Sequence, residues 1–343
     1  MTTLYSLGLG VGTHNAKSEW LEIFYAQPLL NPAAAIVDAV TKTLNYSGGN
    51  QAISITTNQA ADLADALASA GDDTQAAIAR SLSKSQRPLV VTLLESDTGP
   101  ASVPEAYLKL HLLSHRLVKP HGTNLNGIFG ALPNVAWTNQ GAVDLAELPE
   151  RQLQARVNGE LLEVACVDKF PKMTNYVVPK GVRIAHTARV RLGAYLGEGT
   201  TIMHEGFVNF NAGTEGPAMI EGRISAGVFV GAGSDLGGGS STMGTLSGGG
   251  NIVISVGKES LIGANAGIGI PLGDRCKVES GLYITAGTKV IVLDDTGAEV
   301  KTVKARELAN ESDLVFRRNS ITGRVEVVTN KSALQLNSAL HSN

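Results

Sequence analysis

Aliphatic residues follow an unusual spacing in the second half of the chain, from Val178 to about Val292. They recur at every sixth position, and a small residue stands four positions after each. The series is Ile184, Val190, Leu196, Ile202 and Val208, with Ala188, Ala194, Thr200, Gly206 and Ala212 at the small positions. A period of six fits neither an α-helix nor an ordinary strand. It indicates a repeat in which each unit of six supplies one short strand, and three strands complete a coil of eighteen residues.

The six-residue phase is interrupted twice. It breaks over 209–219, resumes at Ile220, and breaks again over 234–250, where seven glycines occur in seventeen residues. The phase returns at Val256 and continues, after a shift, to Val290. Loops that leave a rigid repeat are frequent sites of function. We therefore expect both interruptions to be ejected loops.

The first 177 residues have a different pattern, in which apolar helical stripes alternate with short apolar runs. Asn58 is a candidate cap for a helix that runs to Leu67 and stops at Gly71. Residues 87–95 read as a buried strand. Pro104 suits the first turn of a helix that continues through Leu117 and ends at Lys119-Pro120. The pattern predicts an N-terminal α/β domain.

His111 and His115 stand four residues apart in that helix, as metal ligands can. No acidic residue or third ligand follows at a recognisable spacing. We therefore expect a helix surface or a subunit contact at these histidines.

After Val292 the chain predicts a small β-rich extension. A turn at 294–297, a short helical stretch and a hairpin at Thr322-Gly323 are expected. The predicted organisation is an α/β domain over 1–177, a β-solenoid over 178–292 and a C-terminal extension over 293–343.

Composition narrows the class of protein. Lys and Arg total 28 and Asp and Glu total 31 in 343 residues, a formal charge of −3 that favours neither nucleic acid nor an anionic membrane. No apolar run is long enough to span a bilayer, and no secretory signal is visible. The two cysteines, Cys166 and Cys276, form no metal-binding or disulfide pattern. A cytoplasmic protein is expected.

Long motifs in the second half resemble one enzyme family, the tetrahydrodipicolinate N-succinyltransferases, in the long form of pseudomonads and actinobacteria. They are MHEGFVNFNAGT (203–214), GGGSSTMGTLSGGG (237–250), SVGKESLIGANAGIGIPLGD (255–274), GLYITAGTKV (281–290) and LVFRRNS (314–320). The resemblance implies a left-handed parallel β-helix, as in other hexapeptide-repeat acyltransferases. It also implies a homotrimer with active sites between neighbouring subunits. The activity implied is transfer of succinyl from succinyl-CoA to the amino group of ring-opened tetrahydrodipicolinate, in lysine and diaminopimelate biosynthesis.

Glu205 is the preferred catalytic carboxylate, because glycine flanks it and the first phase break follows it. It is expected at the edge of a site, away from bulk solvent. It can accept the proton of the attacking amine, or it can take the succinyl group as a mixed anhydride, the role that the family assigns to the matching glutamate. The sequence leaves both routes open. His204 is the competing base.

The remaining site residues follow from the resemblance and from their chemistry. Gly222 is the candidate donor to the developing oxyanion, and Ser225 lies near the thioester arm. Ala264 and Asn265 are expected beside the pantetheine arm. Basic and polar residues suit the nucleotide end of CoA: Lys289, Arg317, Arg318, Asn319 and Ser320. Asn209, Asn211 and Arg223 are candidates for binding the substrate.

Metals and rival functions complete the expectations. Aminolysis of a thioester needs no catalytic metal; a structural divalent ion on the trimer axis is possible but not readable from the sequence. N-acetylation of the same substrate stays open, because the donor depends on pocket shape. A γ-type carbonic anhydrase needs three converging histidines, and only His186 and His204 fall in the repeat. A scaffold without catalysis would leave the glycine-rich interruptions unexplained.

Overall fold

The computed structural model describes residues 2–244 and 252–329. The chain divides into two compact units. The first comprises 1–118, 122–171 and 175–177. The second runs from Val178 onward and takes in the short segments 119–121 and 172–174. No helix in the described parts of the chain is long and apolar enough to cross a membrane.

The first unit is built on an antiparallel sheet with strand order β2-β1-β5-β4, and β3 pairs with β1. Its strands are β1 (Ser6–His14), β2 (Trp20–Tyr25), β3 (Leu29–Leu30), β4 (Gln51–Ile55) and β5 (Leu89–Leu94). A second, three-stranded antiparallel sheet in the same unit has the order β7-β6-β8. It consists of β6 (Val135–Thr138), β7 (Gly141–Asp144) and β8 (Val164–Asp168).

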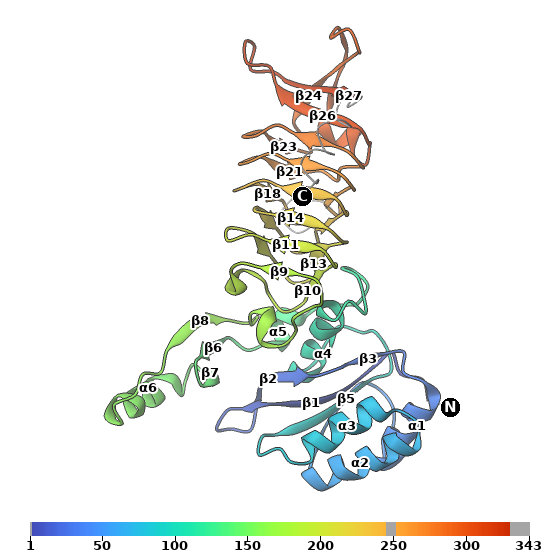
Figure 1. Ribbon diagram of the computed structural model, residues 1–343, viewed down its shortest axis with the longest axis vertical. Helices are drawn as coiled ribbons and strands as arrows, with labels where there is room; N and C mark the ends of the chain where they lie inside the picture. Colours follow the sequence, from blue (N-terminus) through green and yellow to red (C-terminus); the bar gives the residue numbers. More distant parts are fainter. Residues whose placement is uncertain (1, 245–251, 330–343) are drawn as a thin grey trace. The chain divides into compact units, whose positions relative to one another are not determined.

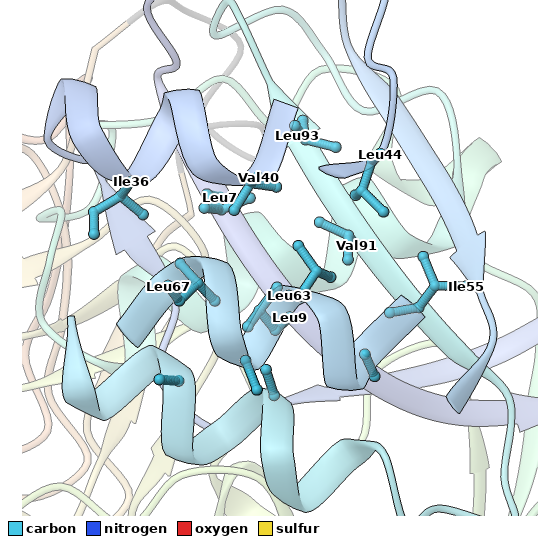
Figure 2. Packing of buried hydrophobic residues seen from close by; sticks show 14 of the residues in the cluster. Leu7, Leu9, Ile36, Val40, Leu44, Ile55, Leu63, Leu67, Val91 and Leu93 are labelled. Atoms are coloured by element: carbon cyan, nitrogen blue, oxygen red, sulfur yellow. The ribbon is translucent and has the colours of Figure 1, made fainter. Parts of the chain in front are cut away.

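Three helices pack their apolar stripes on one face of the larger sheet. They are α1 (Ala34–Thr43), α2 (Thr57–Ser69) and α3 (Asp73–Leu82). Figure 2 shows Leu63 and Leu67 of α2 among Leu7 and Leu9 of β1 and Val91 of β5. Burying each such leucine contributes about 1.5–3 kcal/mol. This apolar layer is the core of the unit. The other helices of the unit are α4 (Val103–Ser114), α5 (Ile128–Ala131) and α6 (Leu148–Val157).

Two helix ends differ from the sequence-based expectation. Thr56, not Asn58, caps α2, because its hydroxyl accepts from the Gln59 amide while the Gln59 side chain accepts from the Thr56 amide. Helix α4 ends at Ser114, five residues before Lys119, since Arg116 turns the backbone into the left-handed region at φ 62°.

His111 of α4 is not on a surface, while His115, the C-cap residue of the helix, is partly buried. The helix is buried over residues 104–114, and His111 is fully buried. The Tyr25 amide donates to His111 Nε2 at 3.3 Å, and Nδ1 lies 2.7 Å from the Tyr107 carbonyl oxygen. Burial lowers the pKa of His111 to about 3. A helix buried on all sides carries no amphipathic stripe, so the sequence pattern could not reveal this environment.

The second unit contains three sheets of short parallel strands, which Figure 1 shows stacked in successive layers. The first repeat sheet holds β9 (Arg183–Ile184), β11 (Thr200–Ile202), β14 (Ala218–Ile220), β17 (Ser234–Leu236), β20 (Leu261–Ile262) and β22 (Lys277–Val278). The second repeat sheet holds β12 (Phe207–Val208), β15 (Arg223–Ile224), β18 (Ser241–Thr242), β21 (Gly267–Gly269) and β23 (Tyr283–Thr285). The third repeat sheet holds β10 (Ala194–Leu196), β13 (Ala212–Thr214), β16 (Phe229–Val230) and β19 (Ser255–Val256).

The six-residue phase predicts the buried positions of these strands. Ile202 pairs with Ile220, and both side chains are buried as expected, whereas Leu236, which pairs with Ile220 and is also buried, falls within the break expected over 234–250. The break expected over 209–219 is not an ejected loop. Thr214 takes the aliphatic position, is fully buried, and its hydroxyl lies 2.7 Å from that of Thr200. A paired hydroxyl can replace a methyl group in the interior without leaving an unsatisfied polar atom.

The second expected loop is shorter than 234–250. Residues 234–236 and 241–242 are strands β17 and β18, in register with their neighbours. The extra length falls between Thr242 and Ser255. Arg223 pairs with Ser241, 18 residues later, whereas Phe229 pairs with Ser255, 26 residues later. Residues 245–250 of the glycine-rich motif lie outside the described residues.

The C-terminal strands continue the first repeat sheet. Strand β26 (Leu314–Arg318) pairs in parallel with β22 and antiparallel with β27 (Val325–Thr329). Strand β24 (Lys289–Leu293) pairs with β27 and with β25 (Glu299–Lys304) across the expected turn at 294–297. The domain boundary at 292/293 stays a prediction, and residues 330–343 lie outside the described part.

Candidate functional site

Several predicted site residues lie in one column of turns, which lead from the first repeat sheet to the second. The turns of this Glu205 column are 203–206, 221–222, 237–240, 263–266 and 279–282. Backbone hydrogen bonds connect them: Phe207 N–H donates to Gly222 at 3.0 Å, Asn265 N–H to Gly238 at 2.9 Å, and Gly281 N–H to Ala264 at 2.8 Å. The stack therefore brings Glu205, Gly222, Ala264 and Asn265 to one side of the repeat.

Glu205 projects from its turn, and its side chain is 70% exposed in the single chain. The expectation that it is shielded from bulk solvent is therefore not met within one subunit. The neighbouring His204 ring is as close as 3.8 Å, from its Nε2 to Glu205 Oε1. The His204 ring stands edge-on to His186 of the preceding coil, with centroids 5.2 Å apart. Both candidate bases thus share one turn.

Arg189 fixes the turn that carries Glu205. Its guanidinium donates to the carbonyl oxygens of Glu205 at 2.8 Å and Gly206 at 3.1 Å. A guanidinium holds two acceptors in a fixed geometry, so these bonds define the backbone direction at Glu205. Sequence reasoning missed Arg189, because it lies outside the motifs that resemble the family. The only hint in the sequence is its position, about one coil of the repeat before Glu205 and Gly206.

Gly222 is buried beneath the next turn of the column. A Cβ atom there would lie 2.1 Å from Ser240 Oγ and 2.6 Å from the Ser240 carbonyl oxygen. Only glycine fits this approach. The Ser240 hydroxyl is itself buried and has no hydrogen-bond partner among the described residues. The oxyanion role of Gly222 stays a prediction.

A second column of turns leads from the second repeat sheet to the third, and we call it the Asn209 column (209–211 and 225–228). Asn209 Oδ1 accepts from Arg191 at 3.1 Å, and Asn211 Oδ1 accepts from the His121 amide at 2.8 Å. Both carboxamide oxygens thus already accept a hydrogen bond, while no described residue accepts one from the NH₂ group of Asn209 or Asn211. Such donors suit the carboxylates of a substrate.

The second repeat sheet separates the two columns. Ser225 lies in the Asn209 column, where its hydroxyl donates to the Thr242 carbonyl oxygen at 2.6 Å. Arg223 is exposed on β15, between the columns. Within one chain, the predicted residues of the two columns therefore form two separate groups.

The third group lies on the C-terminal strands. Arg317 donates to Glu326 at 3.1 Å, and Asn319 donates to the other oxygen of that carboxylate at 2.8 Å. The Arg318 side chain is exposed and donates to the Gly323 carbonyl oxygen. Lys289 is exposed directly opposite Lys304 in the β24–β25 pair. Arg317 is thus the arginine of this group that pairs with a carboxylate, while the Arg318 side chain donates to a backbone carbonyl and Lys289 faces another lysine. Arg318 and Lys289 are therefore the less neutralised cations of the group.

Ser320 and a metal site were also considered from the sequence. Ser320 is exposed at the turn after β26. No group of three or more His, Cys, Asp or Glu residues suited to a metal occurs in the parts of the chain that the structure describes. A structural ion on a trimer axis stays a prediction.

Comparisons with known proteins assign the family. Family models match three stretches: the tetrahydrodipicolinate N-succinyltransferase N-terminal (62–130) and middle (132–172) regions, and the hexapeptide repeat of succinyl-transferase (253–286). The protein named 2,3,4,5-tetrahydropyridine-2,6-dicarboxylate N-succinyltransferase in Pseudomonas paraeruginosa is 71% identical over 99% of this chain and 98% of its own. Its Vibrio cholerae namesake is 60% identical over 99% of both chains.

A solved structure supports the same assignment. It comes from Campylobacter jejuni and is provisionally named a 2,3,4,5-tetrahydropyridine-2-carboxylate N-succinyltransferase. The two chains are 31% identical and superpose with a TM-score of 0.89 over 97% of this chain and 94% of the other. Together with the full-length relatives, this similarity shows that the chain belongs to the tetrahydrodipicolinate N-succinyltransferase family.

Proposed function

We propose that the protein transfers a succinyl group from succinyl-CoA to the amino group of ring-opened tetrahydrodipicolinate. The observation that carries this proposal is the 60–71% identity, over nearly the whole chain, to relatives named for that reaction. The exposed carboxylate of Glu205, in a turn fixed by Arg189, is a group of the kind that such a transfer needs.

The proposed architecture is a homotrimer of left-handed parallel β-helices. In one chain the Glu205 column and the Asn209 column lie on different turns of the repeat, and Glu205 is mostly exposed. If neighbouring subunits pack side by side, the Glu205 column of one meets the Asn209 column of the next. This contact shields Glu205 and combines a carboxylate with amide donors. Each active site then contains residues from two subunits.

Two routes use Glu205. In the first, its carboxylate accepts a proton as the substrate nitrogen attacks the thioester carbonyl, the C–S bond breaks, and CoA leaves as the thiol after protonation. In the second, the carboxylate attacks the thioester and expels CoA. The amine then attacks the resulting anhydride, forms the amide bond and restores the carboxylate. Both routes develop an oxyanion, for which the Gly222 amide is the proposed donor.

CoA is proposed to extend along the repeat toward the C-terminal strands. Ala264 and Asn265 continue the Glu205 column beyond Gly222, so they suit the pantetheine arm, and Ser225 is proposed beside the thioester. Arg318 and Lys289, the less neutralised cations, suit the phosphates, and Arg317, Asn319 and Ser320 complete the nucleotide contacts.

The test is acceptor-dependent release of thiol from succinyl-CoA, with the substrate analogue 2-aminopimelate as acceptor. Glu205→Gln should lower kcat by about 10²–10⁴-fold, the usual contribution of a general base or nucleophile of this kind. Glu198→Gln, which removes an exposed carboxylate on a different turn, is the matched control and should leave kcat unchanged. Full activity in Glu205→Gln, or loss of activity in both variants, contradicts the assignment of Glu205.

The two routes can be separated by rapid quenching without acceptor. Mass spectrometry of the quenched protein should detect a succinyl adduct on the peptide containing Glu205 if the anhydride forms. A protein that turns over fully, yet carries no adduct at any quench time, supports the general-base route instead.

A further inference from the structure

A small pocket in the first unit lies apart from every residue discussed above as a transferase site. Its volume is about 280 Å³. It opens where β1 and β2 of the larger sheet approach the β6–β7 hairpin, and Tyr176 forms part of its wall. Pockets for small molecules begin at about 300 Å³, so this one suits a ligand of only a few heavy atoms.

One wall of the pocket carries a buried acid. Glu22 is 8% exposed, and its two carboxyl oxygens accept from Thr13 Oγ1 at 2.6 Å and from the Tyr176 hydroxyl at 3.1 Å. Burial raises the pKa of Glu22 despite these two bonds. Both donors are neutral. A buried carboxylate with neutral donors is best stabilised by a cation, and among the described residues none forms an ion pair with it.

One hydroxyl connects that acid to a cation of the pocket wall, whose charge lowers the pKa of Glu22 in part. Arg87 lies in the pocket wall, and its Nη1 donates to Thr13 Oγ1 at 3.2 Å, the same hydroxyl that donates to Glu22. Thr13 therefore separates a guanidinium from a carboxylate that would otherwise pair. The remaining N–H groups of Arg87 are donors suited to a ligand carboxylate.

The rest of the wall is apolar. Phe24 is 37% exposed, and Val11 and Ala142 also line the pocket. The Trp137 indole N–H donates to the Asp168 carbonyl oxygen at 2.9 Å, so the ring contributes an apolar surface without a free polar group. A ligand that fits this wall carries a hydrocarbon side chain of moderate size.

We propose that this pocket binds a free α-amino acid with an aliphatic side chain. Its ammonium group pairs with Glu22, its carboxylate pairs with Arg87, and its side chain packs on Phe24 and Trp137. A zwitterion of this kind fills the gap between the two charges that Thr13 keeps apart. The proposal is independent of the acyl-transfer reaction, since no residue of the Glu205 column takes part.

The test is isothermal titration calorimetry of the full-length protein with L-leucine and L-methionine. Isoamylamine and 4-methylpentanoate, which are leucine without its carboxylate and without its amino group, are the ligand controls. We expect one site per chain, with each control ligand at least about tenfold weaker than leucine because one charge-assisted contact is lost. No heat with either amino acid at millimolar concentration overturns the proposal, as does equal affinity for either control ligand.

Variants locate the site. Arg87→Met should weaken leucine binding at least about tenfold and, because the side chain is exposed, should leave the fold intact. Glu22→Gln should weaken it similarly, and its melting temperature shows whether the buried site still folds. Arg80→Met, an exposed arginine of α3 outside the pocket, is the matched control and should bind normally. Unchanged binding in Arg87→Met overturns the assignment.

Binding should persist in Glu205→Gln, which disables the proposed transferase but not this pocket. Conversely, Arg87→Met should keep the wild-type kcat for thiol release. Loss of leucine binding in Glu205→Gln would place the ligand in the acyl-transfer site and overturn the proposal, whatever the outcome for the transferase.

Discussion

At the scale of single residues, the backbone of the Glu205 column is held in place by side chains that have no direct part in acyl transfer. Arg189 holds the backbone of Glu205 and Gly206 from the preceding coil. Ser240, in the following coil, packs directly against Gly222 and leaves no room for a side chain there. The proposed catalytic carboxylate is thereby fixed at its backbone, while its carboxyl group is exposed in the single chain.

Gly222 provides the sharpest test of this packing. Gly222→Ala places a methyl group 2.1 Å from Ser240 Oγ and 2.6 Å from a carbonyl oxygen, and should lower the free energy of unfolding by about 1–3 kcal/mol. We also expect loss of thiol-release activity. In Gly238→Ala, a Cβ meets only Glu221 Oε2 at 3.5 Å, so urea unfolding should be close to wild type. Equal stability of the two variants contradicts the packing described here.

His111 predicts a dependence of stability on pH. The bond from the Tyr25 amide requires an unprotonated Nε2, and burial lowers the pKa to about 3, below the ordinary value of 6.5. The unfolded chain therefore binds a proton below pH 6.5 that the folded chain does not. Stability from this group is complete above pH 6.5, and it falls as pH drops toward 3, by up to about 1.4 kcal/mol per pH unit.

Urea unfolding between pH 7 and 5 measures that slope. His111→Gln removes the titrating group and should reduce the slope by about one proton, leaving the contributions of His115 and His14, whose pKa values burial also lowers. The same slope in wild type and His111→Gln would show that His111 protonates equally in both states.

At the scale of elements, the alternation of buried and exposed positions in each short strand stabilises the repeat. In β20, Ile262 is fully buried and its neighbour Leu261 is 36% exposed. Ile262→Ala should cost about 2–5 kcal/mol through lost burial and the cavity it leaves, whereas Leu261→Ala should cost about 1 kcal/mol or less. Thermal and urea unfolding compare them directly. A larger loss in Leu261→Ala would contradict the register.

The repeat was the part of the fold that sequence could predict, because one side chain per six residues must point inward. Thr214 escaped that pattern, since its place in the interior depends on the hydroxyl of Thr200, fourteen residues earlier, and not on hydrophobicity. The cap of α2 was misplaced because two residues, Thr56 and Gln59, act together. The burial of α4 could not be predicted, as its polar residues are matched only in three dimensions.

The candidate site was predictable in a similar, partial way. The motifs pointed to Glu205, Gly222, Ala264 and Asn265, and the strand register stacks all four in one column. Arg189 was missed because it contacts backbone atoms, and a backbone contact leaves no pattern in the sequence. Asn209 and Asn211 were expected on a loop and instead belong to an ordinary turn of the repeat.

At the scale of the whole molecule, the account rests on active sites shared between subunits. Sedimentation should give a mass of about 107 kDa, three times the 35.7 kDa chain. Glu205→Gln and Asn211→Asp should each be poorly active alone. Asp keeps the oxygen that accepts from His121 but loses the NH₂ donor, so the local fold should survive.

Co-expression of these two variants tests the sharing directly. If a site takes Glu205 from one subunit and Asn211 from the next, random mixed trimers restore both residues at about a quarter of the interfaces. Activity should recover to about that fraction of wild type. Mixed trimers that form but stay as inactive as the separate variants would place both residues in a site within one subunit.

The most direct measurement of the central claim is a competition between acyl donors. The protein is incubated with equal concentrations of succinyl-CoA and acetyl-CoA and with 2-aminopimelate, and the products are identified by mass spectrometry. We predict N-succinyl-2-aminopimelate as the main product, dependent on Glu205. A predominantly acetylated product would contradict the succinyl donor, and no acylated product from either donor would contradict the enzymatic assignment itself.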